Sequence, residues 1–193
     1  IDEASYTIIY KVVGEGTELL SAMTSGMELN VFGPLGSNYP IHEELSAVLL
    51  LGGGVGVPPL YEVAKQYRQL GKRVVVALGF NNASACFYEH EFKALGCEVL
   101  MATMDGSVGV KGTVLDAVDA AGIDLDFVYS CGPMPMLKAI ESRYTSGYTS
   151  FEARMACGIG ACMGCVCKDK QDESIYYRIC KEGPVFEIGK VGL

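Results

Sequence analysis

The sequence predicts an α/β protein built on a parallel β-sheet that helices cover on both faces. Nearly continuous apolar runs alternate with helical stretches from residue 46 to residue 150, a pattern typical of buried parallel strands joined by helices. A glycine-rich loop follows the first apolar run directly. Beyond residue 150 the alternation stops, and the last segment holds five of the eight cysteines, at positions 157, 162, 165, 167 and 180.

The individual elements follow from these runs. Strands are expected at Ala47–Leu51, Val74–Leu78, Glu98–Ala102 and Asp126–Ser130, with a fifth at Thr149–Met155. Helices are expected at 58–70, 86–95, 113–121 and 134–144. The carboxyl ends of parallel strands share one edge of the sheet, and α/β proteins bind their ligands there.

The N-terminal segment has a different pattern. Apolar side chains alternate over residues 5–13, which predicts a strand, and Glu28–Phe32 predicts a second one. Between them Glu18–Met23 is expected to form a short helix with Thr17 as its N-cap. Two strands cannot bury a sheet face alone, so this segment needs further partners.

Composition excludes several classes of protein. Of the 193 residues 20% are charged and 50% hydrophobic, which excludes a fully disordered chain. The 15 Lys and Arg against 23 Asp and Glu give a net charge of −8, so a nucleic-acid partner is not expected. No apolar run reaches the ~18 residues of a membrane span, and no membrane association is expected. The acidic start, Ile1–Glu3, does not resemble a signal peptide, so we expect a reducing, cytoplasmic location.

The loop after the first predicted strand is a candidate nucleotide site. It contains Gly52, Gly53, Gly54 and Gly56, and Pro58 or Pro59 fits the first position of the helix that follows. Glycines let the backbone approach a pyrophosphate, and the free N–H groups of the next helix favour it. The G-x-G-x-x-G spacing is absent in every register, so an ordinary strand-to-helix turn is the alternative interpretation.

Two other strand ends belong to the same expected edge. Gly79–Asn82, after the second strand, offers neither an acid for a ribose diol nor a cation for a 2′-phosphate, which favours NAD over NADP. The fourth strand ends at Cys131, followed by Gly132 and Pro133, and is expected beside the glycine-rich loop. We interpret Cys131 as a candidate wall of the nicotinamide site, or alternatively as a small buried apolar residue.

The cysteine-rich segment carries the most specific motif. Cys157-x4-Cys162-x2-Cys165, followed after fourteen residues by Cys180, has the plant-type spacing of a [2Fe–2S] cluster. The residues between the first three cysteines are small, which lets a loop wrap a cluster. Structural zinc normally uses repeated C-x2–4-C pairs, and disulfides need an oxidising compartment, so both are weaker alternatives. Cys167 is expected to be a non-ligand because four ligands suffice.

With these motifs the chain resembles the electron-transfer subunits of the NAD-dependent (type B) dihydroorotate dehydrogenases. The cysteine string is specific, whereas the nucleotide loops alone suggest only the wider ferredoxin-reductase-like group. The resemblance covers the whole chain in order. It rests on Tyr10–Thr17, Gly33–Gly36, Gly52–Pro59, Asp105–Ser107, Cys131–Pro133, Glu152–Cys165 and Cys180–Phe186.

The resemblance implies three parts: a partial FAD-binding antiparallel barrel over 1–42, an NAD-binding α/β domain over 43–150 and a [2Fe–2S] domain over 151–193. It implies that Gly14, Gly16 and Thr17 match the segment that holds the FAD pyrophosphate. The family's Arg-Pro-x-Ser flavin motif and earlier barrel strands would precede Ile1, so we expect a piece of a longer protein, and FAD binding by this piece alone stays open. The implied partner is an FMN-containing catalytic subunit of dihydroorotate dehydrogenase, in a two-plus-two assembly acting in pyrimidine biosynthesis.

The implied chemistry is redox transfer. NADH delivers a hydride, a [2Fe–2S] cluster carries single electrons, and a flavin can join the two. No nucleophile, general base or triad is therefore expected, and His42 and His90 are expected to be surface or loop residues. The resemblance implies electron flow from dihydroorotate through FMN, the cluster and FAD to NAD. The alternatives are a subunit of a related flavin and iron–sulfur NAD(P)H oxidoreductase, of the sulfide dehydrogenase or ferredoxin–NADP reductase type, and a zinc-stabilised nucleotide-binding module.

Overall fold

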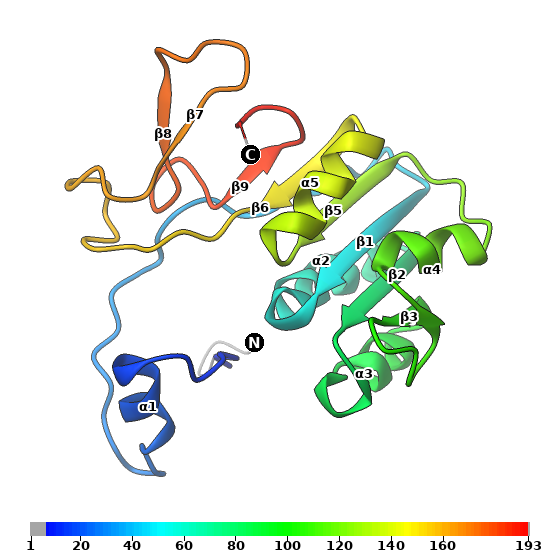
Figure 1. Ribbon diagram of the computed structural model, residues 1–193, viewed down its shortest axis with the longest axis horizontal. Helices are drawn as coiled ribbons and strands as arrows, with labels where there is room; N and C mark the ends of the chain where they lie inside the picture. The colour runs from blue at the N-terminus through cyan, green and yellow to red at the C-terminus, as the bar shows by residue number, and fades with distance from the viewer. Residues whose placement is uncertain (1–6, 193) are drawn as a thin grey trace. The chain divides into compact units, whose positions relative to one another are not determined.

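The structure is a computed structural model that describes residues 7–192. The chain divides into two compact units, with the boundary between Pro34 and Leu35. The larger unit contains a seven-stranded sheet in the order β4-β3-β2-β1-β5-β6-β9, in which only β9 runs antiparallel to its neighbour (Figure 1). Its strands are β1 (Ala47–Gly53), β2 (Arg73–Phe80), β3 (Glu98–Thr103), β4 (Val110–Lys111), β5 (Phe127–Cys131), β6 (Ser146–Ser150) and β9 (Val185–Glu187).

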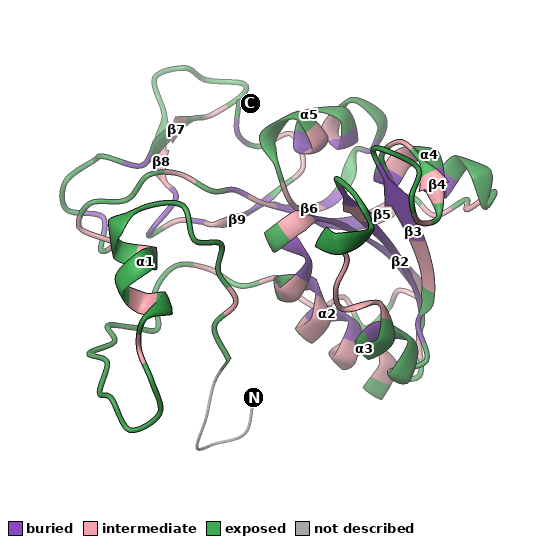
Figure 2. Cartoon of the chain, turned by 60° about the horizontal axis from the view of Figure 1, so that its bottom comes forward, coloured by how far each residue is buried: buried purple, intermediate pink, exposed green. Residues whose placement is uncertain are grey.

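Helices cover both faces of this sheet, as the alternation of apolar runs predicts. They are α2 (Val57–Gln69), α3 (Glu89–Ala94), α4 (Val114–Ala120) and α5 (Met134–Arg143), with short 3₁₀ turns η1 (Gly54–Gly56) and η2 (Ala83–Ala85). Val48 and Leu50 of β1 pack toward α2 and α3, whereas Leu49 and Leu51 pack toward α4 and α5. Figure 2 shows the buried sheet between these two pairs of helices. Burial on both faces explains why the strand has no polar residue.

The fifth parallel strand begins earlier than predicted. The sequence favours Thr149–Met155, but β6 spans Ser146–Ser150 and pairs with β5 from Phe127 opposite Ser146. Gly147 has a φ of 126° and lies against the backbone of Val128, where a side chain would not fit. Glycine usually weakens a strand, but here it is part of β6 because the neighbouring backbone comes so close. After Ser150 the chain leaves the sheet, and Phe151 is buried in the core beneath the cysteine-rich segment.

The cysteine-rich segment packs on the end of the sheet and on α5. It forms a two-stranded antiparallel sheet of β7 (Val166–Lys168) and β8 (Tyr176–Arg178) and then returns through β9 to the main sheet. A third apolar cluster joins it to the α/β core through Leu137 of α5. This cluster also contains Phe151, Cys165, Ile179, Cys180, Phe186 and Val191.

The connector at the start of the larger unit is attached to the α/β core by tyrosines. The Tyr39 hydroxyl donates to the carbonyl of Ser130 at 2.7 Å, and the backbone N–H of His42 donates to the Tyr67 hydroxyl at 2.9 Å. Tyr39 and Ile41 also pack against the core on the α2 face. These contacts place the connector in the larger compact unit, which begins at Leu35.

The smaller unit corrects the N-terminal predictions. Its helix α1 spans Glu15–Ser21 with Gly14 as the N-cap, so Thr17 lies inside the helix instead of capping it. Residues 7–13 and 28–32 form no strand, and residues 5 and 6 of the predicted first strand lie outside the described residues. A strand needs a neighbouring ladder, and Val12 and Phe32 stay exposed instead of covering a sheet face.

None of the helices in residues 7–192 has the length and apolar character needed to cross a bilayer.

Candidate functional site

The carboxyl ends of β1 and β5 lie side by side and form the first part of the site. Gly52 is paired in register with Cys131. A Cβ atom on Gly56 would lie 2.5 Å from the carbonyl carbon and oxygen of Cys131, and one on Gly53 would lie 2.7 Å from the sulfur of Met136. The glycines are therefore required for direct contact between the loop after β1 and the loop after β5. The predicted juxtaposition of the glycine-rich loop with Cys131 is present.

The glycine-rich loop leads straight into α2. Gly54 has a φ of 52°, which favours glycine, and the 3₁₀ turn η1 ends at Gly56, the N-cap of α2. Val57 is the first helical residue, so Pro58 occupies the second position rather than the predicted first. The first turn of a helix has no intrahelical acceptors for its N–H groups, so proline costs little there. The remaining N–H groups and the helix dipole favour an anion at this edge.

Cys131 is a neutral thiol at this edge. Its burial raises the pKa to about 11, while hydrogen bonding to Ser150 and Tyr39 acts in the opposite direction. Burial also raises the pKa of Tyr39, whose ring packs edge-on against Tyr129. Neither group is a candidate nucleophile or base near neutral pH. The Cys131 side chain can form a small, uncharged wall.

A hollow of about 410 Å³ joins the strand ends to the cysteine-rich segment. Gly132, Pro133 and Met134 line it on the β5–α5 side, and Glu152 and Arg154 line it on the other. The remaining lining residues are Leu137 and Ala153. The hollow is thus bounded by Gly132 and Pro133 of the predicted nucleotide site and by the residues just before the cysteine loop, and none of the four predicted cluster cysteines lines it.

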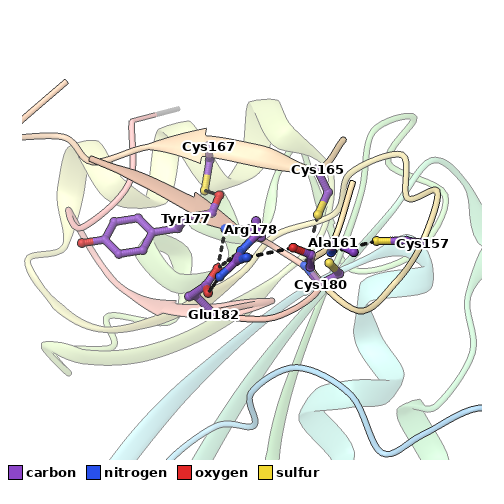
Figure 3. Close-up of polar contacts among 9 residues, drawn as sticks. Cys157, Ala161, Cys165, Cys167, Tyr177, Arg178, Cys180 and Glu182 are labelled. Carbon is purple, nitrogen blue, oxygen red and sulfur yellow. Dashed lines mark hydrogen bonds and ion pairs between the residues drawn. The ribbon is translucent and has the colours of Figure 1, made fainter. Parts of the chain in front are cut away.

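Three of the four predicted cluster cysteines, Cys157, Cys165 and Cys180, are drawn in Figure 3, where backbone N–H groups donate to the sulfurs of Cys157 and Cys165. Cys157 Sγ accepts from the N–H groups of Ala161 at 3.2 Å and Cys162 at 3.3 Å. The Sγ of Cys162 accepts from Gly164 N–H at 3.4 Å, and the Sγ of Cys165 accepts from Cys180 N–H at 3.4 Å. The loop turns through left-handed residues at Gly158, Gly160 and Met163.

Backbone hydrogen bonds to sulfur link the cysteines in two pairs, Cys157 with Cys162 and Cys165 with Cys180. Hydrogen bonding, first from the Cys162 backbone N–H and also from the Cys162 side chain, lowers the pKa of Cys157 to about 6. The Cys165 side chain is the first cause of the raised pKa of Cys180. Cys165 and Cys180 are buried, whereas Cys162 is exposed.

The cysteine loop bears on the identity of the metal. Each iron of an all-cysteine [2Fe–2S] cluster takes two thiolates, whereas structural zinc takes four donors around one ion. Within residues 7–192 no group of three or more Cys, His, Asp or Glu side chains is arranged to hold a metal ion, so the choice between iron and zinc rests on the cysteine spacing and on the N–H groups at the sulfurs. The C-x4-C-x2-C spacing and these N–H groups fit a two-iron cluster better than the zinc alternative.

Cys167 and His42 make contacts of their own, and the expected place of Cys167 and the two histidines outside the site stays a prediction. Cys167 lies on β7 opposite Tyr177, and its thiol donates to the Tyr177 carbonyl at 3.6 Å. His42 contacts Glu44 at 3.0 Å and the Tyr148 hydroxyl at 3.2 Å, while His90 is exposed.

The predicted flavin residues, Gly14, Gly16 and Thr17, lie at the start of helix α1 in the smaller unit. The Thr17 hydroxyl accepts from the N–H groups of Val13 at 2.9 Å and Gly14 at 3.1 Å and donates to the Gly14 carbonyl. Gly16 has open space around its missing side chain. Their role toward FAD stays a prediction.

Sequence reasoning missed one ion pair in the cysteine-rich segment. Arg178 contacts Glu182 and the carbonyl of Gly160, close to the cysteine loop. The four-residue spacing of opposite charges was the available local signal, but the segment is not helical, so no rule pointed to it.

Comparison with known proteins agrees with this geometry. Residues 50–142 match the family model described as the oxidoreductase NAD-binding domain, and residues 152–192 match the iron-sulfur cluster binding domain of dihydroorotate dehydrogenase B. Two curated relatives, from Lysinibacillus sphaericus and Bacillus mycoides, are each 46% identical over the full chain, which covers 76% of their length. Both are named dihydroorotate dehydrogenase B (NAD(+)), electron transfer subunit.

A solved structure shows the same arrangement. A chain of an NADH-dependent reduced ferredoxin–NADP oxidoreductase, described for flavin-based electron bifurcation, superposes with a TM-score of 0.82 at 32% identity. The likeness covers 95% of this chain and 67% of that one. The α/β sheet, the nucleotide-binding family match and the identity to curated relatives lead to one conclusion: the chain belongs to the family of dihydroorotate dehydrogenase B electron transfer subunits.

Proposed function

We propose that the chain passes electrons between NAD and a catalytic subunit that oxidises dihydroorotate to orotate. The observation that carries this proposal is the cysteine loop in which backbone N–H groups donate to the sulfurs of Cys157, Cys162 and Cys165, with the Cys180 N–H as one of the donors. The cysteine loop and the nucleotide edge of the sheet belong to the same compact unit. Family membership agrees with this proposal.

Cys157, Cys162, Cys165 and Cys180 would hold a [2Fe–2S] cluster. Such a cluster, when bound, supplies one-electron transfer. The chain's own part is to keep the sulfurs deprotonated and paired. The N–H groups of Ala161 and Cys162 direct partial positive charge at Cys157 Sγ, which stabilises the thiolate.

The nucleotide edge would hold NAD. The N–H groups at the start of α2 would contact the pyrophosphate. The close contacts of Gly53 and Gly56 hold the loop against the sheet edge, so the pyrophosphate could approach its backbone. Gly52, Gly54, Pro58, Gly132 and Pro133 complete the proposed binding surface. Cys131 would line the nicotinamide side as an uncharged thiol that takes no proton. The absence of a charged side chain in Gly79–Asn82 supports NAD over NADP.

We propose the three-part organisation expected from the resemblance, with a flavin-binding part over 1–42, the NAD-binding part over 43–150 and the cluster part over 151–193. In the full-length protein Gly14, Gly16 and Thr17 would contact FAD in an antiparallel barrel. The Thr17 hydroxyl already fixes the backbone of this turn. The catalytic partner would carry FMN, in a two-plus-two assembly in the cytoplasm. Eight free cysteines fit a reducing compartment.

The test is electron transfer in both directions by the full-length protein purified without oxygen. Addition of NADH should bleach its visible absorption, and dihydroorotate should do so only when the FMN-containing partner is present. Bleaching by NADH with no response to dihydroorotate and partner would favour the second candidate, a related reductase. The TM-score of 0.82 to the ferredoxin–NADP oxidoreductase chain is the observation that favours that candidate.

A further inference from the structure

Arg178 and Glu182 form a fixed ion pair beside the cysteine loop. Arg178 Nε donates to Glu182 Oε2 at 3.0 Å, its Nη2 contacts Glu182 Oε1, and its backbone N–H donates to Glu182 Oε2 at 2.7 Å. The two side chains are only 26% and 31% exposed. The two guanidinium contacts orient the guanidinium plane, and the backbone N–H of Arg178 holds the Glu182 carboxylate in place.

The remaining nitrogen of this guanidinium reaches the cysteine loop. Arg178 Nη1 donates to the carbonyl oxygen of Gly160 at 2.8 Å. Gly160 is buried and left-handed, with a φ of 80°, and a Cβ there would lie 2.8 Å from the Lys181 side chain. The carbonyl is therefore held in a narrow space between the loop and the segment that carries Cys180.

The Gly160 carbonyl and the Ala161 N–H belong to one peptide group. In a planar trans peptide the C=O and N–H point in opposite directions. When Arg178 holds the oxygen on one side, the N–H must point to the other, where it lies 3.2 Å from Cys157 Sγ. Arg178 thus fixes the direction of a hydrogen bond to a sulfur that it does not itself contact.

The ion pair is also oriented by charge. Figure 3 shows Arg178 between Glu182 and the cysteine loop, so the positive group is nearer the sulfurs than the negative group. Cations and N–H donors near thiolates stabilise added negative charge.

We propose that Arg178 is a positioning residue that raises the reduction potential of the bound cluster, by orienting the Gly160–Ala161 peptide and by placing a positive charge beside the thiolates. The proposal rests on cluster binding as proposed above. Uptake of one electron adds one negative charge and transfers no atom from the protein. The oriented Ala161 N–H and the positive charge of Arg178 both favour the reduced cluster. The negative charge of Glu182 opposes the effect of the Arg178 charge, although Glu182 also holds Arg178 in position.

The experiment is a potentiometric titration of the full-length protein with dithionite, followed by visible absorption and by the electron paramagnetic resonance of the reduced form. Arg178→Gln should lower the reduced-to-oxidised ratio at a fixed ambient potential by about tenfold, which is ~59 mV for one electron. It should also alter the resonance, because the Ala161 hydrogen bond is no longer fixed. Arg178→Lys keeps the charge and should recover part of the potential.

Two further variants separate charge from structure. Glu182→Gln removes the opposing charge and leaves the Gly160 contact of Arg178 available, so it should raise the potential. Lys168→Gln removes one positive charge from the same segment, in an exposed pair with Glu173 at 3.1 Å, and should shift the potential by much less than Arg178→Gln.

The inference is overturned if Arg178→Gln has the wild-type potential and resonance at full iron content. It is also overturned if Arg178→Gln and Glu182→Gln shift the potential in the same direction. Removal of opposite charges should shift it in opposite directions, whereas a loosened cysteine loop would shift it the same way in both variants. If Arg178→Gln does not retain its cluster, the potentials of Arg178→Lys and Glu182→Gln still test the proposal: a raised potential in Glu182→Gln supports it, and an unchanged or lowered one contradicts it. An iron-free wild-type protein would instead contradict the proposed function itself.

Discussion

Gly56 and Cys131 are in backbone contact across the carboxyl edge of the sheet: a Cβ on Gly56 would lie 2.5 Å from both atoms of the Cys131 carbonyl. The φ of Gly56 is −76°, which any residue can adopt, so the contact and not the backbone conformation requires glycine. This one contact holds the loop after β1 against the loop after β5. The proposed nucleotide site depends on it.

Gly56→Ala should therefore damage both stability and NAD binding. The added methyl group forces the two loops apart, at a cost of about 1–3 kcal/mol of unfolding free energy. Thermal unfolding and calorimetric titration with NADH on the full-length protein measure the two effects. Gly122→Asn, outside the proposed site, is the matched control, because its surroundings are open and asparagine tolerates its positive φ. Equal NADH affinity in Gly56→Ala and wild type would contradict the assigned site.

Cys131→Ala should slow reduction of the flavin by NADH without abolishing it. The thiol fills the proposed nicotinamide wall, and a misplaced ring reduces the rate; about tenfold corresponds to ~1.4 kcal/mol. Stopped-flow measurement of flavin bleaching in the full-length protein gives this rate directly. An unchanged rate at saturating NADH would show that Cys131 is only a small buried residue.

Alkaline pH should destabilise the fold partly through Cys97. This thiol is 8% exposed, and burial raises its pKa from 9.0 to about 11. A group with a raised pKa contributes stability below its unfolded pKa and loses it as the pH rises through the folded value, here between pH 9 and 11. Urea unfolding across this range should show a steeper loss for wild type than for Cys97→Ala. Parallel pH dependences in the two proteins would rule out this role.

The assignment of four ligands among five clustered cysteines predicts a contrast between two serine variants. Cys162→Ser removes a sulfur from the pair with Cys157 and should cause loss of most of the bound iron. Cys167→Ser should keep the iron, because the Cys167 thiol contacts only the Tyr177 carbonyl across β7 and β8. Iron content of the two purified full-length variants checks the prediction, and loss of iron from Cys167→Ser alone would reverse the ligand assignment.

The α/β core could be predicted because its signal is local. Leu49 to Leu51 are buried on both faces, so the strand appears in the sequence as an uninterrupted apolar run. β6 lacks such a run, since Ser146–Ser150 is held by pairing with β5 and β9, and its predicted position was wrong. The predicted N-terminal strands were wrong for the opposite reason: residues 28–32 have the alternation but no ladder partner in the described residues.

The site divides in the same way. Cysteine spacing predicts the four ligand sulfurs, but the backbone hydrogen bonds that link Cys157 with Cys162 and Cys165 with Cys180 depend on how the loop folds. The contact between Arg178 and Gly160 joins residues 18 positions apart through a backbone carbonyl, which leaves no trace in residue type. Contacts of that kind can be found only in the structure.

The central claim is that the four cysteines bind a [2Fe–2S] cluster, and the most direct test is the iron and acid-labile sulfide content of the full-length protein purified without oxygen, read together with its visible spectrum. The account predicts two irons and two sulfides per cluster site in a brown protein, in addition to any flavin. A preparation without iron or sulfide, or one with a single zinc in their place, would contradict it.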